Sequence, residues 1–190
     1  MAGAIHPDAA LTLRGVGVNP TRRAAIDFLV RMGARIEETA VGEPCGDAGE
    51  PLADFTVRSS ELEAIDLGPA DVAAAIDEIP ILCLAATQAR GKTTIRGAGE
   101  LRNKESDRIE GIATGLTALG ARVSVSGDDI TISGPTPLVG AATETLDDHR
   151  LAMTFAVAGL IARGTTTVDL AQSAAVSYPS FFLELERLRA

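Results

Sequence analysis

A short segment at positions 102–108 concentrates charged side chains just before a stretch with helical periodicity. It reads Arg-Asn-Lys-Glu-Ser-Asp-Arg and contains Lys104, Glu105 and Arg108, and apolar residues recur at helical spacing from Ile109 onward. The pattern predicts that Lys104 and Arg108 lie in the first turns of a helix, on one face. A helix N-terminus carries about half a positive charge, so a cation there costs roughly 0.3–1 kcal/mol. A bound anion would offset that cost, which makes the segment a candidate site for an anionic ligand.

Two other expected helices also begin with cations. Arg150 follows Asp148, which is a candidate N-cap, and Arg22 and Arg23 follow Pro20. Arginine binds planar carboxylates and phosphates through its two-pronged guanidinium, whereas lysine acts as a point charge. A ligand with phosphate and carboxylate groups would therefore suit all of these positions. The alternative is a solvated helix face on which neighbouring acids balance the charge.

Three further interpretations concern proton transfer and ligand binding at the same site. Glu105 lies between two cations, which keep it ionised when the site is empty, and bound anions would allow it to exchange a proton. Asp77 is either an N-cap close to Pro80 or a second carboxylate that faces the ligand. His149 is either a residue of the cap region or a donor that polarises the substrate.

These candidate residues belong to an internal repeat. Segments 11–36 and 93–123 each contain a short strand, Arg-Gly, a polar loop with cations, an amphipathic helix and a final Gly-Ala-Arg plus an apolar residue. A third copy begins at Thr166. Gly120 is expected to end the second helix, and residues 122–133 alternate around Gly-Asp-Asp as a β-hairpin does.

Two other segments, 80–89 and 151–163, are apolar nearly all round, which is typical of helices buried on every side. The repeating unit is therefore a strand, a helix, two strands and a buried helix that leads to the next copy. The sequence predicts a single α/β domain over residues 1–190, built from βαβαββ units with threefold pseudo-symmetry around buried helices.

Composition excludes several classes of protein. The chain has 190 residues, of which 46% are hydrophobic, so it can bury a sizeable core. The net charge of −9 argues against a general nucleic-acid binder and against an anionic membrane partner. The longest apolar stretch, 151–162, is shorter than the ~20 residues that a membrane span needs. Cys45 and Cys83 lack metal-ligand spacing and indicate free thiols in the cytoplasm.

Five segments, in order along the chain, resemble those of the EPSP synthase family, the 3-phosphoshikimate 1-carboxyvinyltransferases. Segment 102–108 is similar to the RxKESDR motif of the family, and segment 147–153, Asp-Asp-His-Arg-Leu-Ala-Met, is similar to its DHR-x-AM motif. The others are 19–22, 76–80 and 176–179. The similarity runs over essentially the whole chain, and the subgroup resembled is bacterial.

The resemblance implies transfer of the enolpyruvyl group from phosphoenolpyruvate to the 5-hydroxyl of shikimate 3-phosphate, a step of the shikimate pathway of aromatic amino acid biosynthesis. At the matched positions, Asp77 would bind the shikimate hydroxyls and accept a proton. Lys104 would bind the 5-hydroxyl side and a phosphate oxygen. Glu105 would transfer the proton at the methylene carbon.

The remaining matched positions concern the second substrate. Arg108 and Arg150 would clamp phosphoenolpyruvate, with His149 beside them. The resemblance implies no metal and no organic cofactor, so catalysis would depend on positioning and electrostatics.

The resemblance covers only the C-terminal part of a family with two domains of three repeats each. This chain would be most of one domain, and the absent domain would supply much of the shikimate phosphate site. Met1 falls inside a helix of the family pattern, and the third repeat predicts a basic residue after Ala190, where the resembled subgroup has a substrate-binding lysine. The parent protein is expected to be monomeric, and this chain alone is expected to be inactive.

Three alternatives stay open at this point. The related UDP-N-acetylglucosamine enolpyruvyl transferases share the fold and chemistry, but their pattern lacks Lys-Glu-Ser-Asp-Arg and Asp-His-Arg. A non-catalytic isolated domain would fold and bind anions weakly. A purely structural interaction domain would tolerate loss of the Glu105 carboxylate in the parent without loss of activity.

Overall fold

The computed structural model of the protein describes residues 1–41 and 50–188 and shows three related α/β units. The first unit contains α1 (Ala2–Ile5), β1 (Ala10–Gly17), α2 (Ala24–Arg31), β2 (Arg35–Ala40) and β3 (Leu52–Arg58). The second contains β4 (Asp66–Leu67), α3 (Pro69–Ala74), the 3-10 helix η1 (Ile76–Glu78), α4 (Ile79–Gln88), β5 (Gly91–Ile95), the 3-10 helix η2 (Gly99–Asn103), α5 (Arg108–Ala118), β6 (Arg122–Ser126) and β7 (Asp129–Gly134). The third contains β8 (Ala142–Thr143), α6 (His149–Gly159), β9 (Thr167–Val168), the 3-10 helix η3 (Ala171–Val176) and α7 (Phe181–Arg187).

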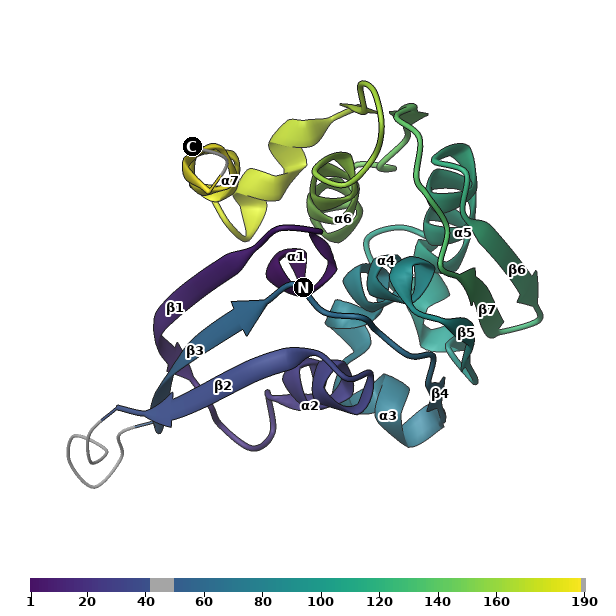
Figure 1. Cartoon of the computed structure of the whole chain (residues 1–190). Helices are drawn as coiled ribbons and strands as arrows, with labels where there is room; N and C mark the ends of the chain where they lie inside the picture. Colours follow the sequence, from purple (N-terminus) through teal and green to yellow (C-terminus); the bar gives the residue numbers. More distant parts are fainter. Residues whose placement is uncertain (42–49, 189–190) are drawn as a thin grey trace.

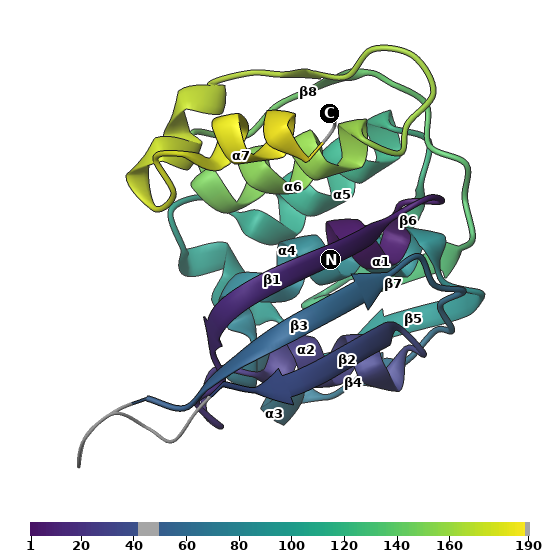
Figure 2. The ribbon, with the colours of Figure 1, turned by 60° about the vertical axis from the view of Figure 1, so that its left-hand side comes forward.

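Each unit contributes its own sheet, and the sheets share parts of one topology. The first sheet has the strand order β1-β3-β2 and the second β4-β5-β7-β6, while β8 and β9 form a parallel pair. The predicted hairpin at 122–133 is confirmed, since β6 and β7 pair antiparallel from Arg122 opposite Ser133 to Ser126 opposite Asp129. In Figure 2 the first sheet lies in front of α1 and α2.

The helices α1, α4 and α6 lie in the interior, with the first sheet, the second sheet and the η3–α7 segment around them (Figure 1). Eight of the ten residues of α4 are buried. The helix therefore packs against other parts of the protein around its whole circumference. Six of the eleven residues of α6 are buried and the others are only partly exposed, so the predicted buried helices at 80–89 and 151–163 are both confirmed, with slightly different bounds. The predicted α/β fold of repeated units is confirmed too.

Two glycines allow α5 to pack closely against α6. A methyl group on Gly111 would collide with the side chain of Leu151, and one on Gly115 would collide with the ring of Phe155. Both partners are completely buried. Since Gly111 and Leu151 each lie in the first turns of their helices, this packing holds the two helix N-termini side by side.

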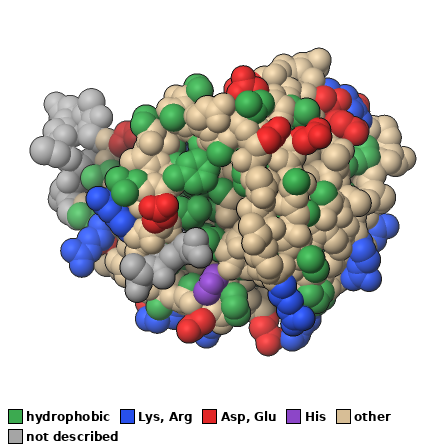
Figure 3. All heavy atoms as spheres, turned by 90° about the horizontal axis from the view of Figure 1, so that it is seen from above, with side chains coloured by type: hydrophobic (Ala, Val, Ile, Leu, Met, Phe, Trp, Pro, Cys, Tyr) green, Lys and Arg blue, Asp and Glu red, His purple; other side chains and the backbone are tan. Residues whose placement is uncertain are grey.

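The third unit buries less apolar surface than the second. Helix α5 contributes six buried residues, whereas α7 contributes none. Hydrophobic side chains gather on the face over this unit (Figure 3), and the large exposed ones near α7 are Val176, Tyr178, Phe182, Leu183 and Leu188. The helix before the hairpin of the second unit is therefore packed more deeply into the core than the last helix of the third.

The structure describes one of the two cysteines. Cys83 is a free thiol, completely buried in α4, and burial raises its pKa. Cys45 lies outside the described residues, as does most of the Gly- and Pro-rich loop around it. In the described ranges no helix has the length and apolarity that crossing a bilayer demands.

Candidate active site

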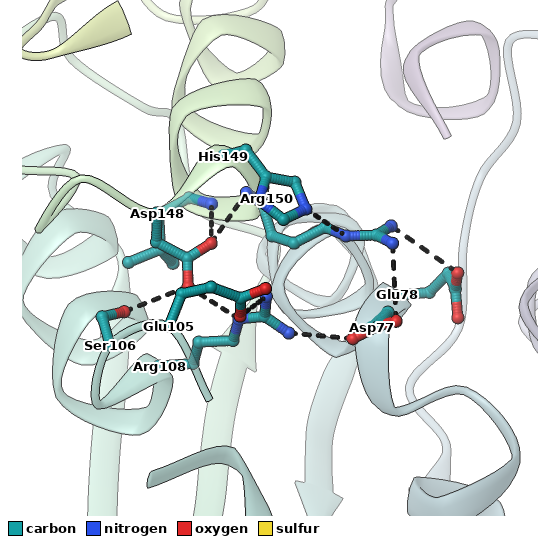
Figure 4. A network of polar contacts seen from close by, with 9 residues as sticks. Asp77, Glu78, Glu105, Ser106, Arg108, Asp148, His149 and Arg150 are labelled. Atoms are coloured by element: carbon teal, nitrogen blue, oxygen red, sulfur yellow. Dashed lines mark hydrogen bonds and ion pairs between the residues drawn. The ribbon is translucent and has the colours of Figure 1, made fainter. Parts of the chain in front are cut away.

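Arg108 begins α5 and is buried among three carboxylates, although it is a cation at a helix N-terminus. Its side chain is 1% exposed. Its Nε donates to Asp148 Oδ2 at 2.8 Å, its Nη1 to Asp77 Oδ1 at 3.0 Å and its Nη2 to Glu105 Oε2 at 2.5 Å (Figure 4). Burial alone would lower the pKa of the guanidinium, but these carboxylates raise it above the ordinary value. Carboxylates of the protein itself thus offset the unfavourable free energy predicted for a cation at this helix start.

Asp148 links the beginnings of α5 and α6. Its Oδ2 accepts from Arg108 and, at 3.1 Å, from the Ser106 hydroxyl. Its Oδ1 accepts from the backbone N–H of Arg150 at 2.8 Å and of Leu151 at 3.4 Å, so the predicted N-cap of α6 is confirmed. Because this carboxylate is completely buried, removing either set of partners would leave a buried charge short of hydrogen bonds.

Asp77 lies in η1 and not at the N-cap of α4. The N-cap position belongs to Glu78, and neither side chain caps the helix, so the N-cap interpretation of Asp77 is wrong. Asp77 Oδ2 instead lies 3.5 Å from Nη2 of Arg150, while Oδ1 accepts from Arg108. Burial would raise the pKa of Asp77, but the hydrogen bond from Arg108 and the charges of Arg150, Arg108 and Lys104 hold it below the ordinary value.

Arg150 and His149 complete the cluster from the first turn of α6. Arg150 Nε donates to His149 Nε2 at 3.1 Å, which requires the imidazole proton to be on Nδ1 if the ring is neutral. Arg150 Nη1 also lies 3.8 Å from Glu78 Oε1. The Arg150 side chain is 28% exposed, so it is more accessible to a ligand than Arg108 is.

Lys104 and Glu105 do not lie in the first turn of a helix, and this part of the prediction is wrong. Helix α5 begins at Arg108, and Lys104 is an extended residue that follows η2. Lys104 and Arg108 are therefore not neighbours on one helix face. Asp107, the N-cap of α5, ends the loop that carries Lys104 and Glu105, because its Oδ1 accepts from the Glu110 N–H at 3.0 Å.

Arg22 and Arg23 do not join this cluster. Arg23 is the N-cap residue of α2 in the first unit, and its guanidinium pairs with Asp27 and Glu38, both at 3.0 Å. Among the described residues, the Arg22 side chain makes no hydrogen bond or ion pair with the cluster either. The helix start that the sequence singled out in the first unit is thus separate from the candidate site.

Two hollows lie beside the cluster. One of about 190 Å³ borders Asp77 and Arg150 and is otherwise mainly apolar, with Ile81, Met153 and Phe181 in its lining. A second of about 240 Å³ lies between α3 and η2 and borders Lys104. Across residues 1–41 and 50–188, the Lys104 ammonium has no carboxylate within 4.0 Å. Lys104 and part of Arg150 therefore line hollows beside the cluster.

The sequence reasoning missed the contacts that Asp148, Ser106 and Glu78 make within the cluster. Asp148 was interpreted only as a cap, although it stands next to His149 and Arg150 in the sequence. Its contact with Arg108 spans forty positions, which no local pattern reveals. Within the described ranges, no group of three or more His, Cys, Asp or Glu side chains has the geometry to hold a metal ion.

Comparison with solved structures shows which class of protein has this fold. The enolpyruvyl transferase NikO from Streptomyces tendae has the same fold, with a TM-score of 0.73 over 100% of this chain and 41% of its own, at 24% identity. The crystallised EPSP synthase from Acinetobacter baumannii is closer, with a TM-score of 0.90, 37% identity and coverage of 98% of this chain and 43% of its own.

Sequence comparison identifies the family. The profile of EPSP synthase (3-phosphoshikimate 1-carboxyvinyltransferase) matches residues 1–185. The 3-phosphoshikimate 1-carboxyvinyltransferases of Roseiflexus sp. (strain RS-1) and Gloeobacter violaceus are 51% and 49% identical to the chain over 99% and 100% of its length. This chain belongs to the EPSP synthase family, as its motifs predicted. It spans 43% of the length of these relatives.

Proposed function

We propose that this chain forms one side of an active site that transfers the enolpyruvyl group of phosphoenolpyruvate to the 5-hydroxyl of shikimate 3-phosphate. The observation that carries the proposal is the cluster itself, in which Arg108 and Arg150 hold two partly exposed carboxylates, Asp77 and Glu105, between helix N-termini. Cations suited to phosphate and carboxylate groups thus lie next to groups suited to proton transfer.

In this proposal the two carboxylates have different tasks. Asp77 accepts the proton of the 5-hydroxyl as the hydroxyl oxygen bonds to the phosphate-bearing carbon. Glu105, which takes up a proton when the substrates bind, delivers it to the methylene carbon. The tetrahedral intermediate then loses phosphate together with the proton held by Asp77, while Glu105 takes its proton back from the same carbon. Lys104 neutralises a phosphate oxygen, Arg150 binds the phosphoenolpyruvate carboxylate or phosphate, and His149 orients the Arg150 guanidinium through the contact at 3.1 Å.

Carboxylates of the protein itself already bind Arg108 in the structure, and this limits how Arg108 could bind a substrate. Its Nη1 and Nη2 are engaged by Asp77 and Glu105. A phosphoenolpyruvate oxygen therefore reaches Arg108 only if it replaces one of these carboxylates. Of the two, Glu105 is the easier to replace, because in the described chain it forms an ion pair with Arg108 alone, whereas Asp77 is also paired with Arg150. Binding would release the Glu105 carboxylate next to the reacting carbon.

The opposite side of the site belongs, in this proposal, to a second domain. The chain spans 43% of its relatives' length, and we assign residues 1–190 to one domain that closes on the substrates together with the other. The parent acts as a cytoplasmic monomer. The free, buried thiol of Cys83 is compatible with a reducing compartment.

The test uses a fusion in which this chain replaces the matching region of the Roseiflexus sp. relative, called here the Roseiflexus fusion. We expect the fusion to release phosphate only when both shikimate 3-phosphate and phosphoenolpyruvate are present. Glu105→Gln keeps the shape of the side chain but removes its proton transfer, so kcat should fall by about 100-fold or more. An active fusion whose kcat is unchanged by Glu105→Gln would overturn the role of Glu105.

The non-catalytic alternative makes a different prediction about the chain alone. If this chain only binds anions, calorimetric titration with phosphoenolpyruvate gives the same weak affinity with and without shikimate 3-phosphate, and the Roseiflexus fusion is inactive. The UDP-N-acetylglucosamine enolpyruvyl transferase alternative predicts turnover with that sugar nucleotide as acceptor. The names of the relatives favour shikimate 3-phosphate.

A further inference from the structure

The loop that carries Lys104 and Glu105 is fastened at its two ends by one ion pair. Arg102 Nη1 lies 2.8 Å from Asp107 Oδ2, five positions along the chain. The ion pair closes a short loop whose inner residues are 103–106. Within the described chain, the Glu105 carboxylate is held by Arg108 and the Lys104 ammonium has no ion pair, so their own contacts fix this loop only in part.

The closed loop is also anchored to the hairpin of its own unit. Arg102 Nη2 donates to the carbonyl of Gly127 at 2.8 Å, and its Nε donates to Asp128 Oδ1 at 3.3 Å. Both acceptors lie in the turn between β6 and β7. Immediately before η2, the Ala98 N–H donates to the Asp128 carbonyl at 2.9 Å. The turn thus holds the chain before the loop and the side chain that closes the loop.

Asp107 transmits this anchoring to α5. One of its carboxylate oxygens accepts from Arg102, while the other accepts from the Glu110 N–H and caps the helix that begins at Arg108. The hydrogen bonds that Arg102 donates to Asp107 and Asp128 raise its pKa above the ordinary value, so the guanidinium is charged throughout the pH range of an assay. The direction of α5 and the path of the loop are therefore coupled through one carboxylate.

We propose that Arg102 and Asp107 are positioning residues, which hold Lys104 and Glu105 in place by closing the 102–107 loop onto the β6–β7 turn. This inference rests on the proposed function, because it assigns Lys104 and Glu105 to the site. The proposal assigns neither residue a contact with substrate, because their side chains bind one another, the β6–β7 turn and the start of α5. Errors of about 1 Å in the position of a catalytic group can lower rates about 100-fold, so an indirect residue of this kind has a measurable effect.

The matched control is Arg23, the N-cap residue of α2, which like Arg102 bonds two carboxylates. It pairs with Asp27 of α2 and Glu38 of β2, in the first unit. Its partners hold no candidate site residue. Arg102→Ala and Arg23→Ala therefore remove comparable surface ion pairs, and only the first opens the loop around Lys104 and Glu105.

The kinetic test compares these variants in the Roseiflexus fusion, at a temperature at which circular dichroism shows each to be folded. For Arg102→Ala we expect kcat to fall by about 10- to 100-fold and the KM for phosphoenolpyruvate to change less than kcat, because Arg150 stays in place. Arg102→Lys should recover part of kcat. Asp107→Asn, which keeps an oxygen to cap α5 but loses the ion pair, should also lower kcat. Arg23→Ala should leave kcat unchanged.

The inference is wrong if Arg102→Ala and Asp107→Asn both keep the kcat of the parent fusion, or if Arg23→Ala lowers kcat as much as they do. An inactive parent fusion would contradict the proposed function, and a second measurement then decides on the loop. Hydrogen exchange on the 190-residue chain should show faster exchange of amides 103–106 in Arg102→Ala and not in Arg23→Ala. Unchanged exchange at 103–106 would overturn the positioning role.

Discussion

Helices α5 and α2 both begin at an arginine or next to one, but the two arginines have very different surroundings. Arg108 of α5 is 1% exposed and pairs with carboxylates from the preceding loop, from η1 and from the N-cap of α6. Arg23 of α2 is 29% exposed and pairs with Asp27 of its own helix and Glu38 of the next strand. The first arginine joins three segments distant in sequence, whereas the second joins adjacent parts of one unit.

The difference shows that the type of residue at a repeat position says little about how much that residue contributes to the stability of the fold. A buried charge with several hydrogen bonds cannot lose a partner without large cost, whereas a solvated pair contributes little. It also separates the candidate site from the rest of the repeat, since the charges of the second and third units converge and those of the first do not. Each prediction below tests one aspect of this contrast.

The largest effect is expected for Arg108→Ala. The substitution leaves Asp148 as a buried carboxylate without its main cation, so the free energy of unfolding should fall by about 3–5 kcal/mol. Urea unfolding of the 190-residue chain, followed by circular dichroism, measures this loss. Arg108→Ala combined with Asp148→Ala should be less destabilising than the sum of the two single substitutions. Additive losses would show that the pair is not the coupled unit described here.

Gly115→Ala is expected to have the next largest effect, because the contrast depends on the close packing of α5 on α6. The added methyl group would collide with the Phe155 ring, which is completely buried and cannot move freely. Overpacking of this kind costs about 1–3 kcal/mol. Thr117→Ala, at an exposed position of the same helix, is the control, and its thermal unfolding midpoint should stay near that of the parent. Equal midpoints for both variants would contradict the close approach.

The sequence predicted much of the fold because its signals were local. The hairpin at 122–133, the buried helices and the ends of the repeat follow from spacing and composition over a few residues. Prediction failed where an interaction between distant segments decided the local structure. The sequence extended the helix back to Lys104, but the side-chain cap at Asp107 sets its start at Arg108.

The site was predictable as a set of residue types but not as a network. The sequence named Asp77, Glu105, Arg108 and Arg150, and the structure brings these four together. It treated Asp148 as a cap alone, because nothing local shows that Arg108, forty positions earlier, reaches the same carboxylate. Arg23 was grouped with the site for the opposite reason, since repeat position suggested a role that its tertiary contacts do not support.

A smaller, pH-dependent effect is expected for Asp77. Arg108 and Arg150 hold the pKa of Asp77 in the folded protein below the ordinary value of 3.8. A carboxylate with a lowered folded-state pKa stabilises the fold above its unfolded pKa, and this stabilisation disappears as the pH falls through the folded pKa. The stability difference between the parent chain and Asp77→Asn should therefore shrink as the pH is lowered below about 4. A difference that stays constant from neutral to acidic pH would argue against these ion pairs.

The smallest effect is expected for Arg23→Ala, and it completes the contrast with Arg108. A partly exposed ion pair of this kind contributes about 0–1 kcal/mol, and salt screens it. Urea unfolding at low and high ionic strength should show a small loss of stability at low salt that vanishes at high salt. The loss for Arg108→Ala should persist at high salt, because its partner Asp148 is shielded from solvent ions. If the two variants responded alike to salt, burial would not be what distinguishes the two helix N-termini.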